Sequence, residues 1–95
     1  MMASNFTMRF QRNNGSLDII IKGDFDGSSA HALLEALRRK SDDMQKITVN
    51  TDGLKNIYDF GLTVFQGHLP SLNRQIEEIV ITGKNRVIFA SREYL

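Results

Sequence analysis

The stretch IIIKGDFDGSSAHALLEAL, residues 19–37, passes from a buried strand into an amphipathic helix within one short turn. Its leading isoleucines favour a strand, and residues 23–29 hold the glycine, aspartate and serine that are typical of turns and helix caps. The apolar residues that follow recur at the spacing of one helix face: Ala30, Leu33, Leu34 and Leu37. We therefore expect a helix from about Ser29 to Lys40.

The residues before this stretch predict a β-hairpin. Apolar and polar side chains alternate over residues 7–11 and again over residues 17–21, and the sequence NNG at residues 13–15 supplies a turn that tolerates positive φ. Ile20 interrupts the alternation, which indicates that the second strand is central and covered on both faces. The first strand is then the antiparallel neighbour of the second.

The residues after the first helix predict a second, parallel strand. Residues 41–43 break the helix, and Lys46 to Asn50 read as a strand reached by a crossover of the length found in βαβ units. The sequence TDGL at residues 51–54 then predicts a turn, and Asn56 to Phe60 a loop.

A second helix is predicted from Gly61, because apolar residues keep helical spacing at Leu62, Phe65, Leu69, Leu72 and Ile76. Pro70 lacks an N–H group and predicts a kink or break near Gly67 to Leu69. Glu78 to Thr82 contains a continuous apolar run and predicts a buried parallel strand that ends at Gly83.

The segment from Asn85 to Leu95 fits either a fifth strand or a short helix, since periodicity does not separate the two in so brief a run. The rest gives the order β-β-α-β-α-β, with an optional last helix. We expect an α/β fold in which a four-stranded mixed sheet is packed by two or three helices, with the first two helices on one face.

Composition limits the classes of function. A chain of 95 residues has room for one modest core, and we expect a single domain over residues 1–95. The absence of cysteine fits a reducing compartment, and the first residues lack a signal-peptide pattern, so we expect a cytoplasmic protein. The net charge of +1 and the lack of a long apolar run argue against nucleic acid and against membrane insertion.

No residue set predicts chemistry, so we expect neither an enzyme nor a bound cofactor or metal. His31 and His68 lie in predicted helices without a serine partner or metal-ligand spacing, and both are expected at the surface. The acidic pairs are adjacent or in turns, which does not place two carboxylates across a cleft. The glycines never form a phosphate-binding motif.

Two segments carry a resemblance to a known family. Residues 19–37 resemble the strand, turn and helix that open the STAS domain family, named for sulfate transporters and anti-sigma-factor antagonists. The sequence KITVNTDGLKNIYDFGLTVF, residues 46–65, resembles that family's second motif, in which a strand leads through an aspartate, a serine or threonine and a Gly-Leu pair into a helix. The resemblance covers about residues 8–83 and implies a STAS-like fold.

The resemblance also implies a regulatory site. In STAS antagonists a partner kinase, which is also the anti-sigma factor, phosphorylates the serine or threonine of the second motif and thereby blocks docking. In this chain the motif's aspartate falls on Tyr58, its phosphoacceptor on Asp59, and its Gly-Leu pair on Gly61 and Leu62. A carboxylate does not accept phosphate from a serine kinase, so the usual switch is not expected here.

Asp59 has two interpretations that are compatible with each other. It is a fixed negative charge at the position of the phosphate, although a carboxylate supplies less charge and fewer oxygens than a phosphate does. It is also a suitable cap for a helix that starts near Phe60 or Gly61. Similarly, Ser28 and Ser29 are either phosphorylation sites or, more simply, cap residues, with Ser28 as the N-cap of the first helix.

The aromatic residues Tyr58 and Phe60 flank Asp59, which is consistent with an exposed docking patch. The alternative is that one of them, Phe60 in particular, packs into the core. The expected partner-binding residues come from both motifs: Phe25, Asp26, Ser28, Ser29, Tyr58, Asp59, Phe60, Gly61 and Leu62.

The leading hypothesis is a non-catalytic protein-interaction module that resembles an anti-sigma-factor antagonist and binds an anti-sigma-factor or kinase-like protein in bacterial signalling and transcription regulation. An alternative is a structural or regulatory subunit of a larger assembly, such as a bacterial phospholipid-transport complex, completed by a partner or as a homodimer. Nucleotide binding, credited to some STAS domains, has no glycine-rich cradle to support it here.

Overall fold

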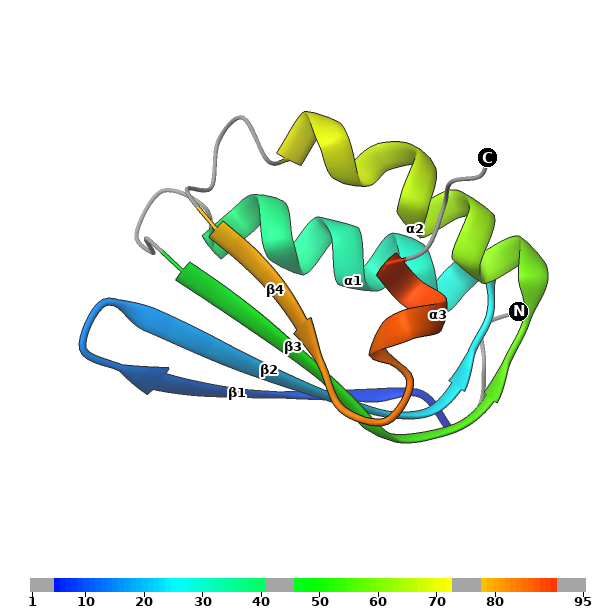
Figure 1. Ribbon diagram of the computed structural model, residues 1–95, viewed down its shortest axis with the longest axis horizontal. Helices are drawn as coiled ribbons and strands as arrows, with labels where there is room; N and C mark the ends of the chain where they lie inside the picture. Colours follow the sequence, from blue (N-terminus) through cyan, green and yellow to red (C-terminus); the bar gives the residue numbers. More distant parts are fainter. Residues whose placement is uncertain (1–4, 41–45, 73–77, 91–95) are drawn as a thin grey trace.

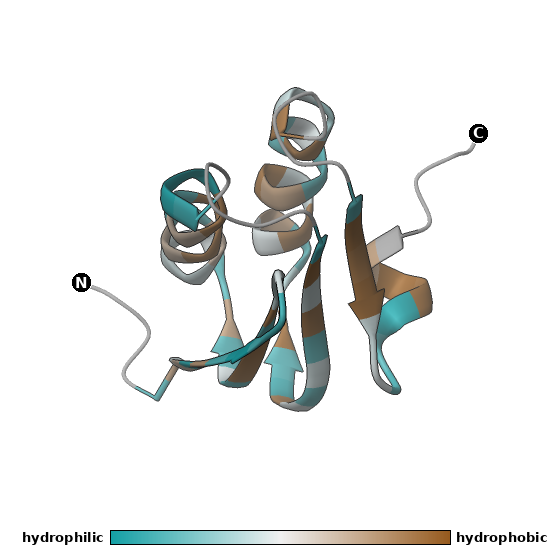
Figure 2. Cartoon of the chain, turned by 90° about the vertical axis from the view of Figure 1, so that its left-hand side faces the viewer, coloured by the Kyte–Doolittle hydropathy of each residue, from teal (hydrophilic) through white to brown (hydrophobic). Residues whose placement is uncertain are grey.

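The computed structural model describes residues 5–40, 46–72 and 78–90. Four strands form one sheet in the order β1-β2-β3-β4, and α1 and α2 lie together on one face of it (Figures 1 and 2). The elements are β1 (Thr7–Asn13), β2 (Ser16–Phe25), α1 (Gly27–Lys40), β3 (Lys46–Ile57), α2 (Asp59–Leu72), β4 (Glu78–Thr82) and α3 (Arg86–Ala90). The predicted α/β class and element order are confirmed.

The sheet is mixed, as predicted. β1 pairs with β2 in antiparallel register, whereas β2 with β3 and β3 with β4 are parallel pairs. The hairpin turn has positive φ at Asn14 and Gly15, which is the backbone conformation that the NNG sequence favours. Both parallel connections pass through a helix on the same face, as the right-handed crossover rule requires.

Ile20 does not lie beneath a second layer. Leu17, Ile19 and Ile21 point to the helices and are buried, but Ile20 points to the opposite face and is only half-buried. Among the described residues no helix or strand covers that face. The prediction that this strand is covered on both faces is therefore wrong.

β3 is longer than predicted, because the expected turn at residues 51–54 and the expected loop at residues 56–60 belong largely to regular elements. The strand continues to Ile57 alongside β2, with shifts in register that absorb the irregular TDGL sequence. Only Tyr58 separates β3 from α2. Pairing with β2 outweighs the turn preference of residues 51–54.

The two long helices begin two residues earlier than predicted, at Gly27 and at Asp59. α2 continues through Pro70 to Leu72, so the predicted break at Gly67 to Leu69 is absent. Pro70 lies in the last turn, where the missing N–H costs one helical hydrogen bond, and Leu72 beyond it is buried against the core. Ile76, expected on the same face, lies outside the described residues.

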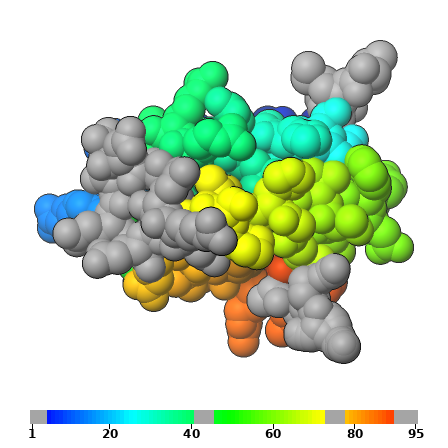
Figure 3. Space-filling model, turned by 90° about the horizontal axis from the view of Figure 1, so that it is seen from above, coloured from blue at the N-terminus to red at the C-terminus, as the bar shows by residue number. Residues whose placement is uncertain are grey.

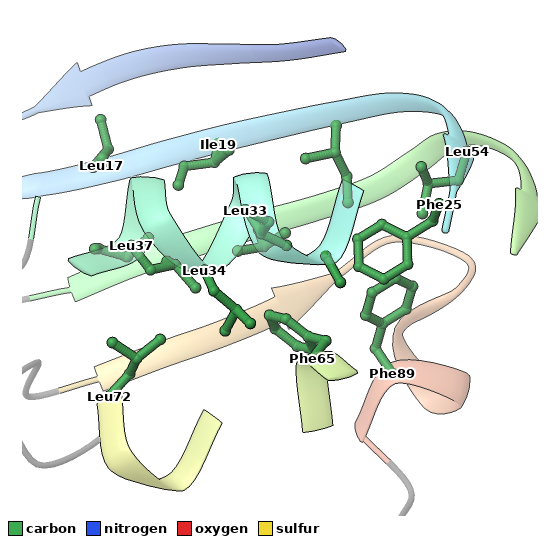
Figure 4. Packing of buried hydrophobic residues seen from close by; sticks show 14 residues of the cluster. Leu17, Ile19, Phe25, Leu33, Leu34, Leu37, Leu54, Phe65, Leu72 and Phe89 are labelled. Carbon is green, nitrogen blue, oxygen red and sulfur yellow. The ribbon is translucent and has the colours of Figure 1, made fainter. Parts of the chain in front are cut away.

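The core lies between the sheet and the helices and is completed by α3. Figure 4 shows Phe25 of β2, Phe65 of α2 and Phe89 of α3 meeting at one end of it. The Phe25 and Phe89 ring centroids are 4.9 Å apart, and those of Phe65 and Phe89 are 5.7 Å apart, in edge-to-face contacts. Within the segment that fitted either a strand or a helix, Arg86–Ala90 is thus a short helix whose Phe89 closes the core, and residues 91–95 lie outside the described residues.

A network around Thr51 holds α3 in place. The Thr51 hydroxyl donates to the carbonyl of Thr82 (2.8 Å) and accepts from the backbone N–H of Asn85 (3.2 Å). The Asn85 side-chain amide donates to the carbonyl of Thr51 (2.8 Å), and the Lys84 N–H donates to the Asp52 carboxylate (2.7 Å). The bulged part of β3 therefore anchors the connection from β4 to α3.

Candidate functional site

The two predicted motifs meet at the carboxyl ends of the central strands β2 and β3, where α1 and α2 begin (Figure 1). The Tyr58 N–H donates to the Phe25 carbonyl at 3.0 Å and ties the two strand ends together. A Cβ atom at Gly61 would lie 2.8 Å from the Asp26 carbonyl oxygen and 2.9 Å from that of Phe25. Gly61 therefore lets the start of α2 rest directly on the backbone that leads into α1.

At the start of α1 the N-cap is Asp26. Its carboxylate accepts from the Ser29 N–H at 2.9 Å and from the Ser29 hydroxyl at 3.0 Å, and that hydroxyl also donates to the Asp24 carbonyl. The bond from the Ser29 N–H lowers the pKa of the Asp26 carboxyl below its ordinary value, against the opposing effect of burial. The prediction that Ser28 is the N-cap is wrong: Ser28 is an exposed residue of the first turn.

At the start of α2 the carboxylate of Asp59 is exposed. The first helical hydrogen bond runs from the Leu62 N–H to the Tyr58 carbonyl at 3.1 Å, so Tyr58 holds the cap position and Asp59 is the first helical residue. Within the described ranges no hydrogen bond reaches the Asp59 carboxylate. Its charge still lies at the positive end of the helix dipole, where an anion is favoured.

The aromatic residues on either side of Asp59 face solvent. Tyr58 is 50% exposed and Phe60 is 67% exposed. The alternative that one of them packs into the core is therefore wrong. The Phe60 ring lies over Gly27 instead, since a Cβ atom at Gly27 would be 2.7 Å from the ring, and the side chain thus bridges the starts of both helices.

The structure divides the expected partner-binding residues into two groups. Phe25 and Ser29 are buried, and so is Gly61 in the first turn of α2. These three residues therefore support the surface without forming part of it. The side chains that reach solvent at least in part are Asp26, Ser28, Tyr58, Asp59, Phe60 and Leu62. We call these six residues the helix-start surface.

Further contacts that the sequence did not indicate stabilise the carboxyl ends of β2 and β3. The Asn56 side-chain amide donates to the Asp24 carboxylate at 2.7 Å, which links the ends of β2 and β3. The Asp24 N–H donates to the Asn5 side chain at 3.2 Å, so the segment before β1 is also held here. Asn5, Asp24 and Asn56 lie far apart in sequence and fall in no motif, so no pattern connects them.

The described residues do not bring together a metal-binding set. His31 and His68 are exposed, as predicted, and their ring centroids are 6.4 Å apart across α1 and α2. Within residues 5–40, 46–72 and 78–90 no three potential metal ligands cluster. In the same ranges no helix combines the length and the apolar character needed to cross a membrane.

Comparison with known proteins identifies the fold. No family model matches the sequence, and none of the curated proteins matches it. An anti-sigma factor antagonist from Mycobacterium paratuberculosis is similar in structure, with a TM-score of 0.67 and 14% identity over 88% of this chain and 73% of that one. The unphosphorylated form of the anti-sigma factor antagonist SpoIIAA gives a TM-score of 0.56 and 13% identity, covering 72% and 64% of the two chains.

The protein Mglu contains the same arrangement as part of a longer chain. One crystal structure of Mglu gives a TM-score of 0.71 and 16% identity over 82% of this chain, which corresponds to only 20% of the length of Mglu. Identities at this level establish the fold alone. The predicted STAS-like fold is therefore confirmed, and the chain has the architecture of the anti-sigma factor antagonists.

Proposed function

We propose that this chain is a non-catalytic regulatory module that docks onto a partner protein through the helix-start surface, in the manner of an anti-sigma factor antagonist. The partner class that this proposal favours is an anti-sigma-factor or kinase-like protein of a bacterial cytoplasm. Two structurally similar proteins are named anti-sigma factor antagonists, which supports extending the proposal to transcription regulation.

The single observation that supports docking is the exposure of two large aromatic side chains around one carboxylate. Tyr58 and Phe60 are half or more exposed, and aromatic residues at the centre of an interface commonly supply much of its binding energy. Backbone contacts at Gly61 and at Tyr58 fix the surface in position before a partner arrives. A fixed surface loses little conformational entropy on binding.

Asp59 makes this proposed module insensitive to the usual switch. It occupies the position equivalent to the phosphoacceptor, and a carboxylate does not accept phosphate from a serine kinase. We therefore propose that docking is controlled by the amount of the protein or of its partner rather than by phosphorylation of residue 59.

Partner capture tests the helix-start surface. The tagged chain and its Tyr58→Ala, Phe60→Ala and Asp59→Ala variants are used to capture proteins from a lysate of the source cells, and captured proteins are identified by mass spectrometry. The expected result is a kinase-like anti-sigma factor held by the parent chain and reduced at least tenfold with Tyr58→Ala and Phe60→Ala.

Lys46→Ala is the matched control, because Lys46 is exposed at the amino end of β3. The helix starts lie at the other end of the strands. This variant should capture as much partner as the parent chain. Undiminished capture by all three site variants would remove the helix-start surface from the proposal. The same experiment in the presence of ATP should leave residue 59 without phosphate.

A second candidate function is supported by a different surface. In α3, Val87 is 63% exposed and Ile88 is 47% exposed, and the neighbouring strand β4 has half-buried Ile79, Val80 and Ile81. Figure 2 shows the apolar colouring of this side of the molecule. Apolar side chains gathered at a sheet edge favour a subunit of a larger assembly, such as a phospholipid-transport complex, or a homodimer.

Light scattering on the purified chain separates these candidates. If the surface of α3 joins copies of the chain, the parent protein is dimeric and Val87→Glu is monomeric, with the same circular dichroism spectrum. A chain that is monomeric at high micromolar concentration, and that captures no multi-subunit complex, contradicts the second candidate and leaves the first unaffected.

A further inference from the structure

A groove between β1 and α1 is separate from the helix-start surface. It is a hollow of about 420 Å³ lined by Met8, Phe10, Ala32, Glu35, Ala36, Arg39 and Lys40. The two alanines leave space on the side of α1, and Phe10 on the other side is 46% exposed. The Lys40 ammonium lies 5.4 Å from the centre of the Phe10 ring and stabilises it by a cation–π contact.

β1 is also an edge strand. It pairs with β2 on one side, and among the described residues no strand pairs with its other side. Its seven residues are in regular register with β2, without proline or bulge, and they are largely exposed. Such an edge has backbone N–H and C=O groups available to pair with one more extended segment.

The charges around this edge are mainly positive. β1 contains Arg9 and Arg12 and no acidic residue, and Arg39 and Lys40 line the groove. Among the described residues that line it, the one acidic residue, Glu35, already forms ion pairs with Arg38 and Arg39. A segment that brings carboxylates next to β1 is therefore favoured, and a basic segment is disfavoured.

The same charges argue against a second copy of this chain as the occupant. Two β1 strands paired in antiparallel fashion about Phe10 would place Arg9 opposite Gln11 and Arg12 opposite Met8 of the other copy. Four arginines would then share one short ladder with no acidic residue of β1 to neutralise them. Cationic side chains on an edge strand are a known protection against such self-pairing.

We propose that the β1–α1 groove binds an extended peptide segment of a partner protein, in which apolar residues alternate with acidic ones. The segment adds a fifth strand beside β1, and its apolar side chains fill the hollow over Phe10 and the alanines of α1. Its carboxylates lie on the opposite face of the added strand and pair with Arg9, which points away from the helices together with its strand partner Ile20. Backbone pairing supplies affinity, and the hollow and the charges supply specificity.

The test uses a defined probe. A fluorescent, acetylated seven-residue peptide in which leucine and valine alternate with glutamate is titrated with the parent chain, and binding is followed by anisotropy and by NMR shifts of backbone amides. The expected result is saturable binding with shifts at Met8, Phe10, Ala32 and Ala36. A rise in salt from 50 to 500 mM should weaken it severalfold, since the charges are exposed.

Two control peptides and three variants make the test specific. A peptide with lysine in place of glutamate, and one N-methylated on its pairing face, should each bind at least tenfold more weakly. Ala32→Phe, which fills the hollow, and Arg9→Glu, which reverses the charge that faces the carboxylates, should weaken binding of the parent peptide at least fivefold. Lys84→Glu makes the same charge change at an exposed site between β4 and α3 and should leave binding unchanged.

Several results would overturn the proposal. These are no binding at millimolar protein, equal binding of the lysine and glutamate peptides, shifts confined to Tyr58 and Phe60, or competition of the peptide with dimer formation through β1. Binding of the chain to anionic vesicles in place of the peptide would assign the positive charges to a lipid surface instead.

Discussion

Gly61 and Gly27 lie in the first turns of α2 and α1, but a side chain at each would meet different neighbouring atoms. A Cβ atom at Gly61 would come within 2.9 Å of three backbone atoms of Phe25 and Asp26, and backbone held in a strand end and a helix cap has little freedom to move. A Cβ atom at Gly27 would meet only the exposed ring of Phe60. The first glycine is required by the fold, whereas the second shapes the helix-start surface.

Gly61→Ala is therefore expected to lower the free energy of unfolding by about 2 kcal/mol or more, because the start of α2 must move off the Phe25–Asp26 backbone. Gly27→Ala should change it by less than about 1 kcal/mol, since alanine favours the helix and the Phe60 ring can turn aside. Urea denaturation of the two variants measures both. Equal losses would contradict this assignment of roles.

The N-cap of α1 gives a second expectation at this scale. Asp26→Ala removes the acceptor of the Ser29 N–H and should lower the free energy of unfolding by about 1 kcal/mol at pH 7. Ser28→Ala is the control: Ser28 is exposed and follows the cap, so its variant should differ from the parent by a few tenths of a kcal/mol. Denaturation in urea distinguishes the two.

The same carboxylate predicts a dependence on pH. Its pKa in the folded protein is lower than the ordinary value of 3.8, so ionised Asp26 stabilises the fold above that pH and the contribution is lost as pH falls through the folded pKa. Asp26→Asn keeps a capping side chain without the charge. The difference in unfolding free energy between parent and Asp26→Asn should narrow below pH 3.8, and a difference that stays constant down to pH 2 would contradict this cause.

The choice of cap also shows what the sequence did not determine. Asp26 and Ser28 are both good N-caps, and apolar spacing locates a helix face without locating its first residue within a turn. The exposure of Phe60 was equally open, because a phenylalanine next to a helix start packs inward in one geometry and outward in another. Both outcomes depend on how the two helix starts meet: Gly27 lies against the Phe60 ring, and Gly61 lies against the Asp26 backbone. These contacts join residues more than thirty positions apart in the sequence.

Among the elements, β3 and α3 differ most from what the local sequence pattern predicts. Residues 51–54 have the composition of a turn, but parallel pairing with β2 extends the strand to Ile57. α3 is a short helix because the Thr51 network turns the chain after Gly83 and directs Phe89 into the core. Strand length and the last helix thus depend on neighbours that lie outside any local window, whereas the hairpin and both long helices were predictable from periodicity.

Thr51→Val tests the network that holds α3. Valine keeps the shape of threonine but leaves the Asn85 N–H without its acceptor, so the free energy of unfolding should fall by about 1–2 kcal/mol. α3 should also open more readily than the rest of the molecule. Hydrogen exchange should be faster at the Arg86 and Phe89 amides, by about tenfold for each 1.4 kcal/mol lost locally, while amides of α1 change little.

At the scale of the whole molecule, α2 lies between α1 on one side and β4 with α3 on the other (Figure 3). α3 approaches α2 through Gln66, whose side-chain amide donates to the carbonyls of Ile88 and Phe89 at 3.1 and 2.9 Å. The core is therefore closed by residues from both ends of the described chain. Phe6 packs edge-to-face on Phe25 at 6.0 Å, and Phe89 packs on the same ring.

Phe89→Ala should accordingly destabilise the whole domain and not α3 alone. Removing a fully buried phenylalanine costs about 3–5 kcal/mol, which is a large part of the stability of a domain this small. Val87→Ala in the same helix, at an exposed position, should stay within about 0.5 kcal/mol. A thermal melt and a urea titration of both variants check this, and a small loss for Phe89→Ala would mean that α3 is dispensable.

The overall architecture was the most predictable level. Two helices on one face of a four-stranded sheet follow from the order of elements and from the right-handed crossover. The position of the helix-start surface follows as well, because both motifs end strands that are parallel neighbours. The groove beside β1 did not follow, since it depends on two alanines of α1 facing an edge strand, and neither feature has a signature in sequence.

The order of the sheet has a consequence for synthesis. Each strand pairs with the one that precedes it in the chain, so a nascent polypeptide leaving the ribosome finds each partner strand already present. The aromatic cluster, in contrast, waits for Phe89. At translation rates of about 5–20 residues per second, roughly one to five seconds separate the emergence of Phe65 from that of Phe89. We expect Phe25 and Phe65 to stay partly uncovered during that interval, because Phe89 packs on both of their rings in the folded protein.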